Sequence, residues 1–196
     1  MPRAKLRTPQ LRERVLGVAV ALLASEGVAA FTARRIASEA RTSTPAIYEL
    51  FGDKGGLLRE VFFEGFRLLH RELEQAGESE DARSDLLELL RRYRRFIREN
   101  QMLSDVMFSR PFTDFDPGPA EVAASGSVRV LIVERVRRCI AAGSLRGDAT
   151  DVAHVLVALV QGLAAAENAG RLGTSDESVE RRWSLAVGAT LAGLGS

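Results

Sequence analysis

The chain has 196 residues, of which 46% are hydrophobic and 27% are charged, a composition that suits a globular protein with a substantial core. Its single cysteine, Cys139, excludes an internal disulfide framework and a zinc site built from several cysteines. Residues 1–55 carry nine basic and five acidic side chains, whereas the remainder is slightly acidic. This asymmetry predicts a polyanionic partner at the N-terminal end.

The first 30 residues can be interpreted in two ways. Basic residues precede the apolar run Val15–Ala24 and small residues follow it, as in a signal peptide. Apolar residues at three- and four-residue steps, with Thr8-Pro9 as a start signal and Gly27 as a stop, are instead typical of an amphipathic helix. We favour the helix, because the next segment needs a supporting partner. The later apolar run Val152–Val160 is shorter than the ~20 residues of a membrane span, so the sequence predicts a soluble, cytoplasmic protein.

Helical spacing dominates the chain and two-residue alternation is absent, which predicts an all-α fold. The predicted helices cover residues 9–26, 33–40, 44–50, 55–76, 82–100, 102–109, 120–142, 149–169 and 176–194. The Pro-rich stretch Pro111–Pro119 is the clearest loop.

The second and third predicted helices are short, lie about three residues apart and follow a longer helix, which is the plan of a helix-turn-helix unit. Their apolar positions face inward, namely Phe31, Ile36, Ala37, Ala40, Ile47 and Phe51. The second short helix exposes Thr44–Ala46 and Tyr48, with Ser43 or Thr44 as its cap. Such an N-terminus, with small and hydroxylated side chains, can enter the major groove of DNA.

Residues 28–58 resemble the DNA-binding signature of the tetracycline-repressor (TetR) family. The shared pattern is Phe31-Thr32, Ile36-Ala37, Ala40, Ser43, Ile47-Tyr48, Phe51, Lys54 and Leu57. The resemblance implies a three-helix helix-turn-helix DNA-binding domain over 1–54 and a helical effector-binding and dimerisation domain over 55–196. It implies a homodimeric repressor that a small apolar or amphipathic effector releases from a pseudo-palindromic, double-stranded DNA operator.

The resemblance also assigns roles to individual residues. Thr32, Tyr48 and Lys54 would contact phosphates, Arg34 would reach a base edge or the backbone, and Thr44–Ala46 would line the base-reading surface. The family turn usually has glycine where this chain has Arg41, so Arg41 must take the glycine conformation or the turn must adjust. Glu49 is expected to point away from DNA. The predicted DNA-binding residues are Thr32, Arg34, Arg41, Ser43, Thr44, Pro45, Ala46, Tyr48 and Lys54.

Seven of the nine phenylalanines fall between residues 62 and 115, including Phe112 and Phe115. Most belong to an ordinary core, but the cluster also suits an effector cavity with few polar groups. The cavity residues that we expect are Phe66, His70, Tyr93, Phe96, Met107 and Phe108.

The last two predicted helices are apolar on more than one face, with Val155 and Leu185 among the residues off the main stripes. Helices of this kind are buried on more than one side, and a four-helix interface across a two-fold axis accounts for that. The interface residues that we expect are Leu156, Leu159, Leu163, Trp183, Val187 and Leu191.

Several other features have ordinary interpretations. Cys139 lies on an apolar helix face and is expected to be inert, and His154 is a core or interface histidine. Five arginines between residues 91 and 98 are interpreted as the solvated face of one helix: Arg91, Arg92, Arg94, Arg95 and Arg98. No nucleophile elbow, phosphate loop, metal cluster or catalytic carboxylate pair stands out, so we expect neither an enzyme nor a cofactor. A DNA-binding regulator or architectural protein without an effector is the alternative.

Overall fold

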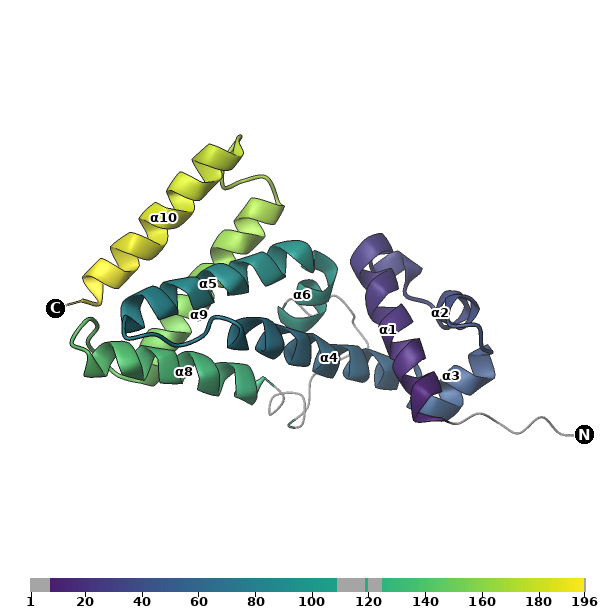
Figure 1. The fold of residues 1–196 in the computed structure, drawn as a ribbon. Helices are drawn as coiled ribbons and strands as arrows, with labels where there is room; N and C mark the ends of the chain where they lie inside the picture. The colour runs from purple at the N-terminus through teal and green to yellow at the C-terminus, as the bar shows by residue number, and fades with distance from the viewer. Residues whose placement is uncertain (1–7, 109–118, 120–124, 196) are drawn as a thin grey trace, which may run out of the picture. The chain divides into compact units, whose positions relative to one another are not determined.

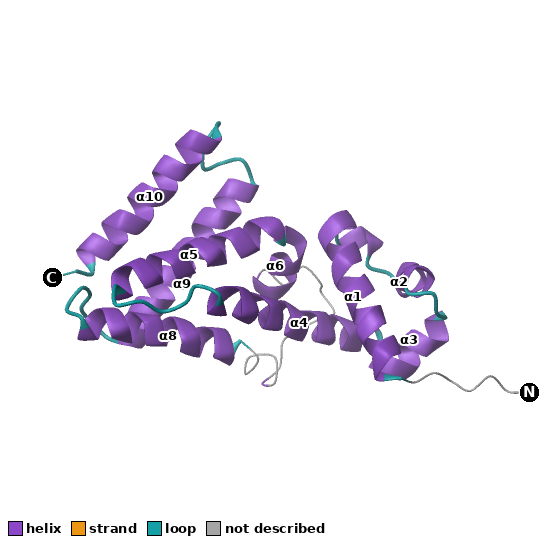
Figure 2. Ribbon diagram, viewed as in Figure 1, coloured by secondary structure: helices purple, strands orange, loops and turns teal. Residues whose placement is uncertain are grey.

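The computed structural model describes residues 8–108, 119 and 125–195, and every regular element in this part of the chain is a helix (Figures 1 and 2). The elements are α1 Pro9–Glu26, η1 Val28–Ala30, α2 Ala33–Glu39, α3 Thr44–Phe51, α4 Lys54–Glu74, α5 Ala82–Glu99, α6 Gln101–Phe108, α8 Gly126–Ala141, α9 Ala149–Asn168 and α10 Asp176–Gly193. The all-α prediction is confirmed. The predicted loop at Pro111–Pro119 and the start of the predicted helix 120–142 lie, apart from Pro119, outside the described residues.

The chain forms two compact units. The first consists of Met1–Phe66 with Asn100–Ala124, and the second of Arg67–Glu99 with Ser125–Ser196. Helix α4 contributes its first half to one unit and its second half to the other.

The first unit is built around α1, which forms the predicted amphipathic helix. The Thr8 hydroxyl accepts a hydrogen bond from the Leu11 amide at 3.2 Å, and Gly27 ends the helix with a φ of +79°. Its buried face, Leu11, Val15, Ala19, Leu22 and Leu23, packs against α2 and α6. Helix α6 also rests on α4, because Gly65 has no side chain where a Cβ would lie 2.6 Å from the Met107 sulfur.

The second unit packs α5, α8 and α9 against one another, with α10 on α9. Asp85 fastens the start of α5, since its carboxylate accepts hydrogen bonds from the Ser79 amide at 2.8 Å and from Arg138 on α8 at 2.8 Å. Cys139 is buried and its thiol donates to the Ala82 carbonyl at 3.1 Å. Burial raises the pKa of the Cys139 thiol, which disfavours the reactive thiolate.

Helix α9 has 20 residues and a mean hydropathy of 1.5, so by length and composition alone it could cross a membrane. The sequence-based expectation rested on the shorter run Val152–Val160 inside it, which His154 interrupts and which reaches Ala166 only across Gln161. Helix α9 packs against α5, α8 and α10, as a core helix does, yet only 28% of its apolar window is buried within the described structure. A large part of an apolar helix is therefore left uncovered by the residues that the structure describes.

Candidate nucleic-acid interface

Helix α2 is capped by Thr32, whose hydroxyl accepts a hydrogen bond from the Arg35 amide at 3.2 Å. This N-cap satisfies one of the amides that the first helical turn leaves without a partner. Ile36 and Ala37 are buried, while Thr32 and Arg34 face solvent. The arrangement places Thr32 and Arg34 at the exposed N-terminal end of α2.

The turn between α2 and α3 adopts the glycine conformation at Arg41, whose φ is +52°. The Arg41 amide donates to the Ser38 carbonyl at 3.1 Å and the Thr42 amide to the Ala37 carbonyl at 2.9 Å. This pair of hydrogen bonds is the Schellman arrangement, which normally has glycine at the left-handed position. Of the two possibilities raised by the sequence, Arg41 therefore takes the strained conformation and the turn keeps its shape.

Helix α3 is capped by Ser43, whose hydroxyl accepts from the Ala46 amide at 3.3 Å, and Pro45 lies in its first turn. Ile47 and Phe51 are buried, and Tyr48 is 44% exposed. Ser43 and Pro45 face solvent, whereas Thr44 and Ala46 are half-buried. The start of α3 thus presents small side chains, which is what close approach to base edges requires.

The junction of α3 and α4 depends on a close backbone contact. The Asp53 carboxylate caps α4 by accepting from the Gly56 amide at 2.7 Å, and Lys54 is the first, exposed residue of that helix. A Cβ at Gly56 would lie 1.9 Å from the Phe51 carbonyl oxygen, so only glycine fits there. The contact fixes Lys54 next to the end of α3.

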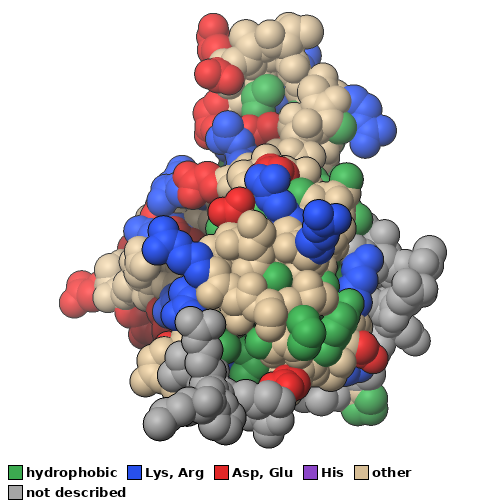
Figure 3. All heavy atoms as spheres, turned by 90° about the vertical axis from the view of Figure 1, so that its right-hand side faces the viewer, with side chains coloured by type: hydrophobic (Ala, Val, Ile, Leu, Met, Phe, Trp, Pro, Cys, Tyr) green, Lys and Arg blue, Asp and Glu red, His purple; other side chains and the backbone are tan. Residues whose placement is uncertain are grey.

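The exposed arginines of this region differ in their partners. Arg35 forms ion pairs with Glu26 at 3.0 Å and Glu39 at 3.5 Å. Arg34 and Arg41 form no ion pair or side-chain hydrogen bond with any residue that the structure describes. Figure 3, viewed from the side that carries α2 and α3, shows Lys and Arg side chains at separate points around uncharged side chains and backbone.

Seven of the nine predicted DNA-binding residues are exposed on α2, the turn, α3 and the first turn of α4, and the other two, Thr44 and Ala46, are half-buried. Glu49 is exposed on α3 as well. Sequence reasoning missed two arginines on α1, Arg12 and Arg14. Their side chains contact the backbone of α3 and α2, across 38 and 26 residues of sequence, and no local pattern signals such contacts.

The six predicted effector residues fall into both units. In the first unit, Phe66 packs edge-on against Phe108 with ring centroids 5.9 Å apart, and Met107 is buried. In the second, Phe96 and Tyr93 are buried, and the Tyr93 hydroxyl accepts from the Gln161 amide nitrogen at 2.8 Å. Burial raises the Tyr93 pKa to about 12. Phe112 and Phe115 lie outside the described residues.

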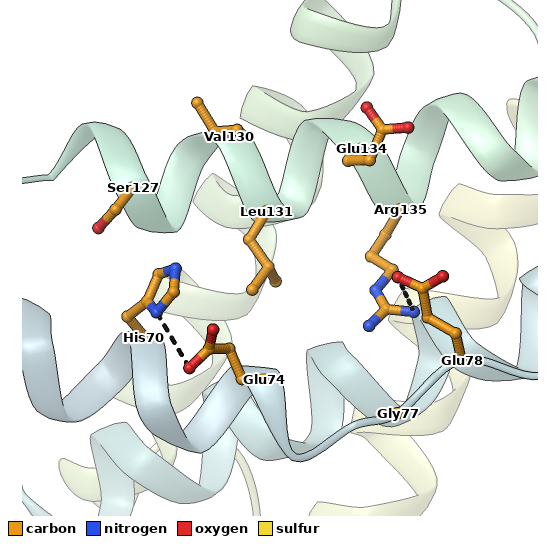
Figure 4. A pocket seen from close by; sticks show the side chains of 9 residues that line it. All are labelled: His70, Glu74, Gly77, Glu78, Ser127, Val130, Leu131, Glu134 and Arg135. Atoms are coloured by element: carbon orange, nitrogen blue, oxygen red, sulfur yellow. Dashed lines mark ion pairs between the residues drawn. The ribbon is translucent and has the colours of Figure 1, made fainter.

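His70 lines an open groove of about 500 Å³ between the second half of α4 and α8 (Figure 4). At one end of the groove, the His70 ring lies 3.4 Å from the Glu74 carboxylate. At the other end, the Arg135 guanidinium lies 3.3 Å from the Glu78 carboxylate. Leu131 lies between them. Ordered along the chain, the lining is His70, Glu74, Gly77, Glu78, Ser127, Val130, Leu131, Glu134 and Arg135.

Helices α9 and α10 direct most of the predicted interface residues into the core of the single chain. Leu156, Trp183, Val187 and Leu191 are buried there, whereas Leu159 and Leu163 are half-buried. The stripe that the sequence assigned to a second chain is therefore mainly the one that packs within this chain. The opposite face is exposed, with Val155, Ala158 and Gly162 on α9 and Leu185, Gly188 and Ala192 on α10.

The arginine-rich face of α5 is not uniformly solvated, which corrects the interpretation from sequence. Arg94 is buried, and it donates to Glu167 on α9 at 2.8 Å and to Glu180 on α10 at 2.6 Å. Its guanidinium also stacks 4.6 Å from the centre of the Trp183 ring. The hydrogen bond from Arg94 lowers the pKa of Glu180, so this arginine joins three helices by its charge.

Comparisons with known proteins agree with this architecture. Residues 15–61 match the model for bacterial regulatory proteins of the tetR family, and residues 86–190 match the tetracyclin repressor-like C-terminal domain. Among curated protein sequences, none matches the chain.

Solved structures of similar fold extend over nearly the whole chain. A protein of unknown function from Rhodococcus sp. RHA1 has 28% identity over 97% of this chain and 98% of its own, with a TM-score of 0.82. The TetR family transcriptional regulator PfmR from Thermus thermophilus has 20% identity over 93% and 100%, with a TM-score of 0.68. The Streptomyces coelicolor TetR family protein ActR, in complex with (S)-DNPA, has 22% identity over 93% and 96%, with a TM-score of 0.64.

The capped helices α1, α2 and α3 with the first turn of α4 form a helix-turn-helix head. Such a head, followed in the chain by a helical second unit, defines a DNA-binding protein of the helix-turn-helix class. The two model matches together cover most of the sequence, and the chain belongs to the tetR family of bacterial regulatory proteins. It is a DNA-binding transcriptional regulator and not an enzyme. Among the described residues, no group of three or more His, Cys, Asp or Glu side chains could hold a metal ion.

Proposed function

We propose that this protein is a cytoplasmic, homodimeric repressor that a small apolar or amphipathic effector releases from a pseudo-palindromic operator. The observation that carries the DNA-binding part is the exposed start of α3, together with two arginines, Arg34 on α2 and Arg41 in the turn, that have no protein partner among the described residues. Unpaired guanidinium groups suit phosphates and base edges.

The proposed DNA contacts fall into two groups, those to phosphates and those to base edges. Thr32, Tyr48 and Lys54 bind phosphates, which positions the head on the duplex without selecting its sequence. The segment Thr44–Ala46 reads base edges in the major groove, and Arg34 contacts the adjoining phosphate backbone. In a dimer, two copies of α3 then enter successive major grooves about one helical turn apart.

The dimer is proposed to form through the exposed face of α9 and α10. Gly162 and Gly188 lie within these helices, where glycine costs ~1 kcal/mol relative to alanine. A Cβ at either position would meet no atom within 4 Å, so packing inside the chain does not require glycine there. Val155 and Leu185 are 49% and 69% exposed on the same face. Closely packed helices of a second copy would use the glycines and cover the exposed side chains.

The effector is proposed to bind in the helical body. The groove beside His70, which lies within the second unit, offers polar ends around Leu131. The similar protein ActR has a small molecule, (S)-DNPA, in its structure, which supports a ligand role for this fold. Effector binding would lower the affinity for DNA by a coupling free energy of about 1–3 kcal/mol.

Selection from random double-stranded DNA, followed by titration of the selected sequence, tests the proposal. We expect a pseudo-palindrome, one dimer for each site, and release when the molecule retained through purification, identified by native mass spectrometry, is added back. Enrichment without any palindrome would contradict a dimeric reader. The alternative of a regulator without an effector would be favoured if the purified protein carries no small molecule and no compound in a library releases it from the operator.

The dimer face has its own test. Leu185→Arg places a charge on the proposed interface, and Val130→Arg places the same charge at a similarly exposed apolar site on α8. We expect sedimentation to show monomers for Leu185→Arg and dimers for Val130→Arg, because an unpaired charge is costly to bury. Dimers in both variants would exclude this face.

A further inference from the structure

Helix α1 carries two arginines that reach the helix-turn-helix backbone, and their contacts are highly specific. Arg12 donates from Nη1 to the Leu50 carbonyl at 2.6 Å, pairs through Nη2 with Glu60 at 2.7 Å and stacks 4.6 Å from the centre of the Phe51 ring. Arg14 donates from Nε to the Ala40 carbonyl at 3.0 Å.

The two accepting carbonyls occupy equivalent places. Leu50 lies in the last turn of α3 and Ala40 is the C-cap of α2, where helix carbonyls lack partners of their own. A cation at a helix C-terminus also interacts favourably with the helix dipole. Arg12 and Arg14 are two residues apart, so they leave different sides of α1, and each fastens one of the two short helices.

We propose that Arg12 and Arg14 are positioning residues that hold α3 and α2 in the orientation that reads DNA, and that they do not bind phosphate. The inference rests on the proposed DNA contacts of this head. Arg12 links the end of α3 to both α1 and, through Glu60, α4, so all three helices share one guanidinium. Short helices of seven and eight residues have little stability of their own, which makes such anchors necessary.

The alternative is that these arginines belong to the basic surface that attracts DNA. The two roles differ in salt dependence, because each lost phosphate contact lowers the slope of log K against log [salt] by about 0.9. They differ also in the effect of Glu60. Removing an acidic side chain near DNA should leave or improve a purely electrostatic complex, whereas it should weaken a complex that depends on the Arg12–Glu60 pair.

The experiment compares Arg12→Met, Arg14→Met and Glu60→Ala with Arg34→Ala as the matched control. For each, affinities for the selected operator and for random duplex are measured over a range of salt. We expect the three test variants to lower the ratio of specific to non-specific affinity by about tenfold, as for loss of a charged hydrogen bond, with an unchanged slope. Arg34→Ala should instead lower the slope by about 0.9 per protomer.

Hydrogen exchange on the DNA-free protein provides a second measurement that does not depend on DNA binding. Arg12→Met should accelerate exchange of the Gly52 amide, which donates to Tyr48 at the end of α3, by about tenfold or more. Arg14→Met should do the same for the Thr42 amide, and Arg34→Ala should change neither. If wild type fails to bind DNA, the proposed function fails, and this measurement still decides whether the arginines hold the helices.

Arg12→Lys covers the case in which Arg12→Met unfolds the head. Lysine keeps the charge but cannot donate to Leu50 and Glu60 in the same forked geometry. A positioning role predicts that Lys leaves the Gly52 amide poorly protected and the specificity ratio low. Full recovery of specific binding by Arg12→Lys, or a slope lowered by about 0.9 in Arg12→Met with unchanged exchange, would overturn the inference.

Discussion

Replacing Arg41 with glycine should raise the stability of the fold while it lowers the affinity for DNA. An L-residue in the left-handed conformation costs about 1–2 kcal/mol, and Arg41 is held there at φ +52° by the Schellman hydrogen bonds of the α2–α3 turn. Glycine avoids this cost but loses about 0.5–1 kcal/mol more in chain entropy on folding. Arg41→Gly should therefore raise the free energy of unfolding by about 0.5–1 kcal/mol.

The same substitution removes an exposed guanidinium with no partner among the described residues. If Arg41 binds phosphate, Arg41→Gly should weaken specific and non-specific binding and lower the salt slope by about 0.9 per protomer. Arg41→Ala is the matched control, because it loses the charge but keeps an L-residue at the strained position. It should show the same loss of slope without the gain in stability.

Denaturant unfolding and salt-dependent DNA titration of the three proteins check this reasoning. Equal stability of Arg41→Gly and Arg41→Ala would refute the argument from strain. An unchanged salt slope in both would refute the phosphate contact, whatever their stability.

Three further predictions concern the head and the second unit. Gly56→Ala should destabilise the head by more than about 2 kcal/mol and weaken operator binding, because its Cβ would lie 1.9 Å from a carbonyl oxygen. In thermal unfolding the control Gly55→Ala should be far milder, since the nearest neighbour of its Cβ is a side-chain oxygen at 3.2 Å. Tyr48→Phe should weaken operator and random DNA alike in filter binding, and a change in sequence preference would count against a phosphate contact. Hydrogen bonds from Ser79 lower the pKa of Asp85. Asp85 therefore stabilises the fold above its unfolded-state pKa, and this contribution is lost as the pH falls through its folded-state pKa. Asp85→Asn should flatten the acidic part of a curve of unfolding free energy against pH.

The helices could be predicted from the sequence because their ends carry local signals. Thr8, Ser43 and Ser175 all act as N-caps through their hydroxyls, and glycines at positive φ follow α1 and α3. These signals depend on neighbouring residues, so an isolated sequence contains them in full. The short helices of the head could be located for the same reason.

The assignment of faces could not be predicted in the same way. An apolar stripe with helical spacing shows that a helix is buried, but not against what, and α9 and α10 each have two apolar faces. The stripe with Trp183 and Leu156 packs within the chain, and the face with Leu185 does not. The prediction that Arg94 faces solvent was wrong for a related reason, because its carboxylate partners lie 73 and 86 residues away in the sequence.

Some basic side chains of the head bind groups within the protein and others face solvent, and the count of basic residues alone does not show this. Within the described part of the head, Arg12, Arg14 and Arg35 bind protein groups, while Arg34 and Arg41 have no such partner and Lys54 starts α4 at the surface. Only the outward set should release counterions from DNA. Neutralising Arg34, Arg41 and Lys54 together should therefore lower the salt slope by about 2.7 per protomer, at about 0.9 for each contact.

Neutralising the inward set, Arg12, Arg14 and Arg35, removes the same formal charge and provides the control. A long-range field depends on total charge, so it would treat the two sets alike, whereas direct phosphate contacts distinguish them. The inward variant should keep the wild-type slope while it loses preference for the operator. Equal loss of slope in the two triple variants would show that DNA senses the head only as a basic surface, and that the partners of these arginines inside the protein do not matter for binding.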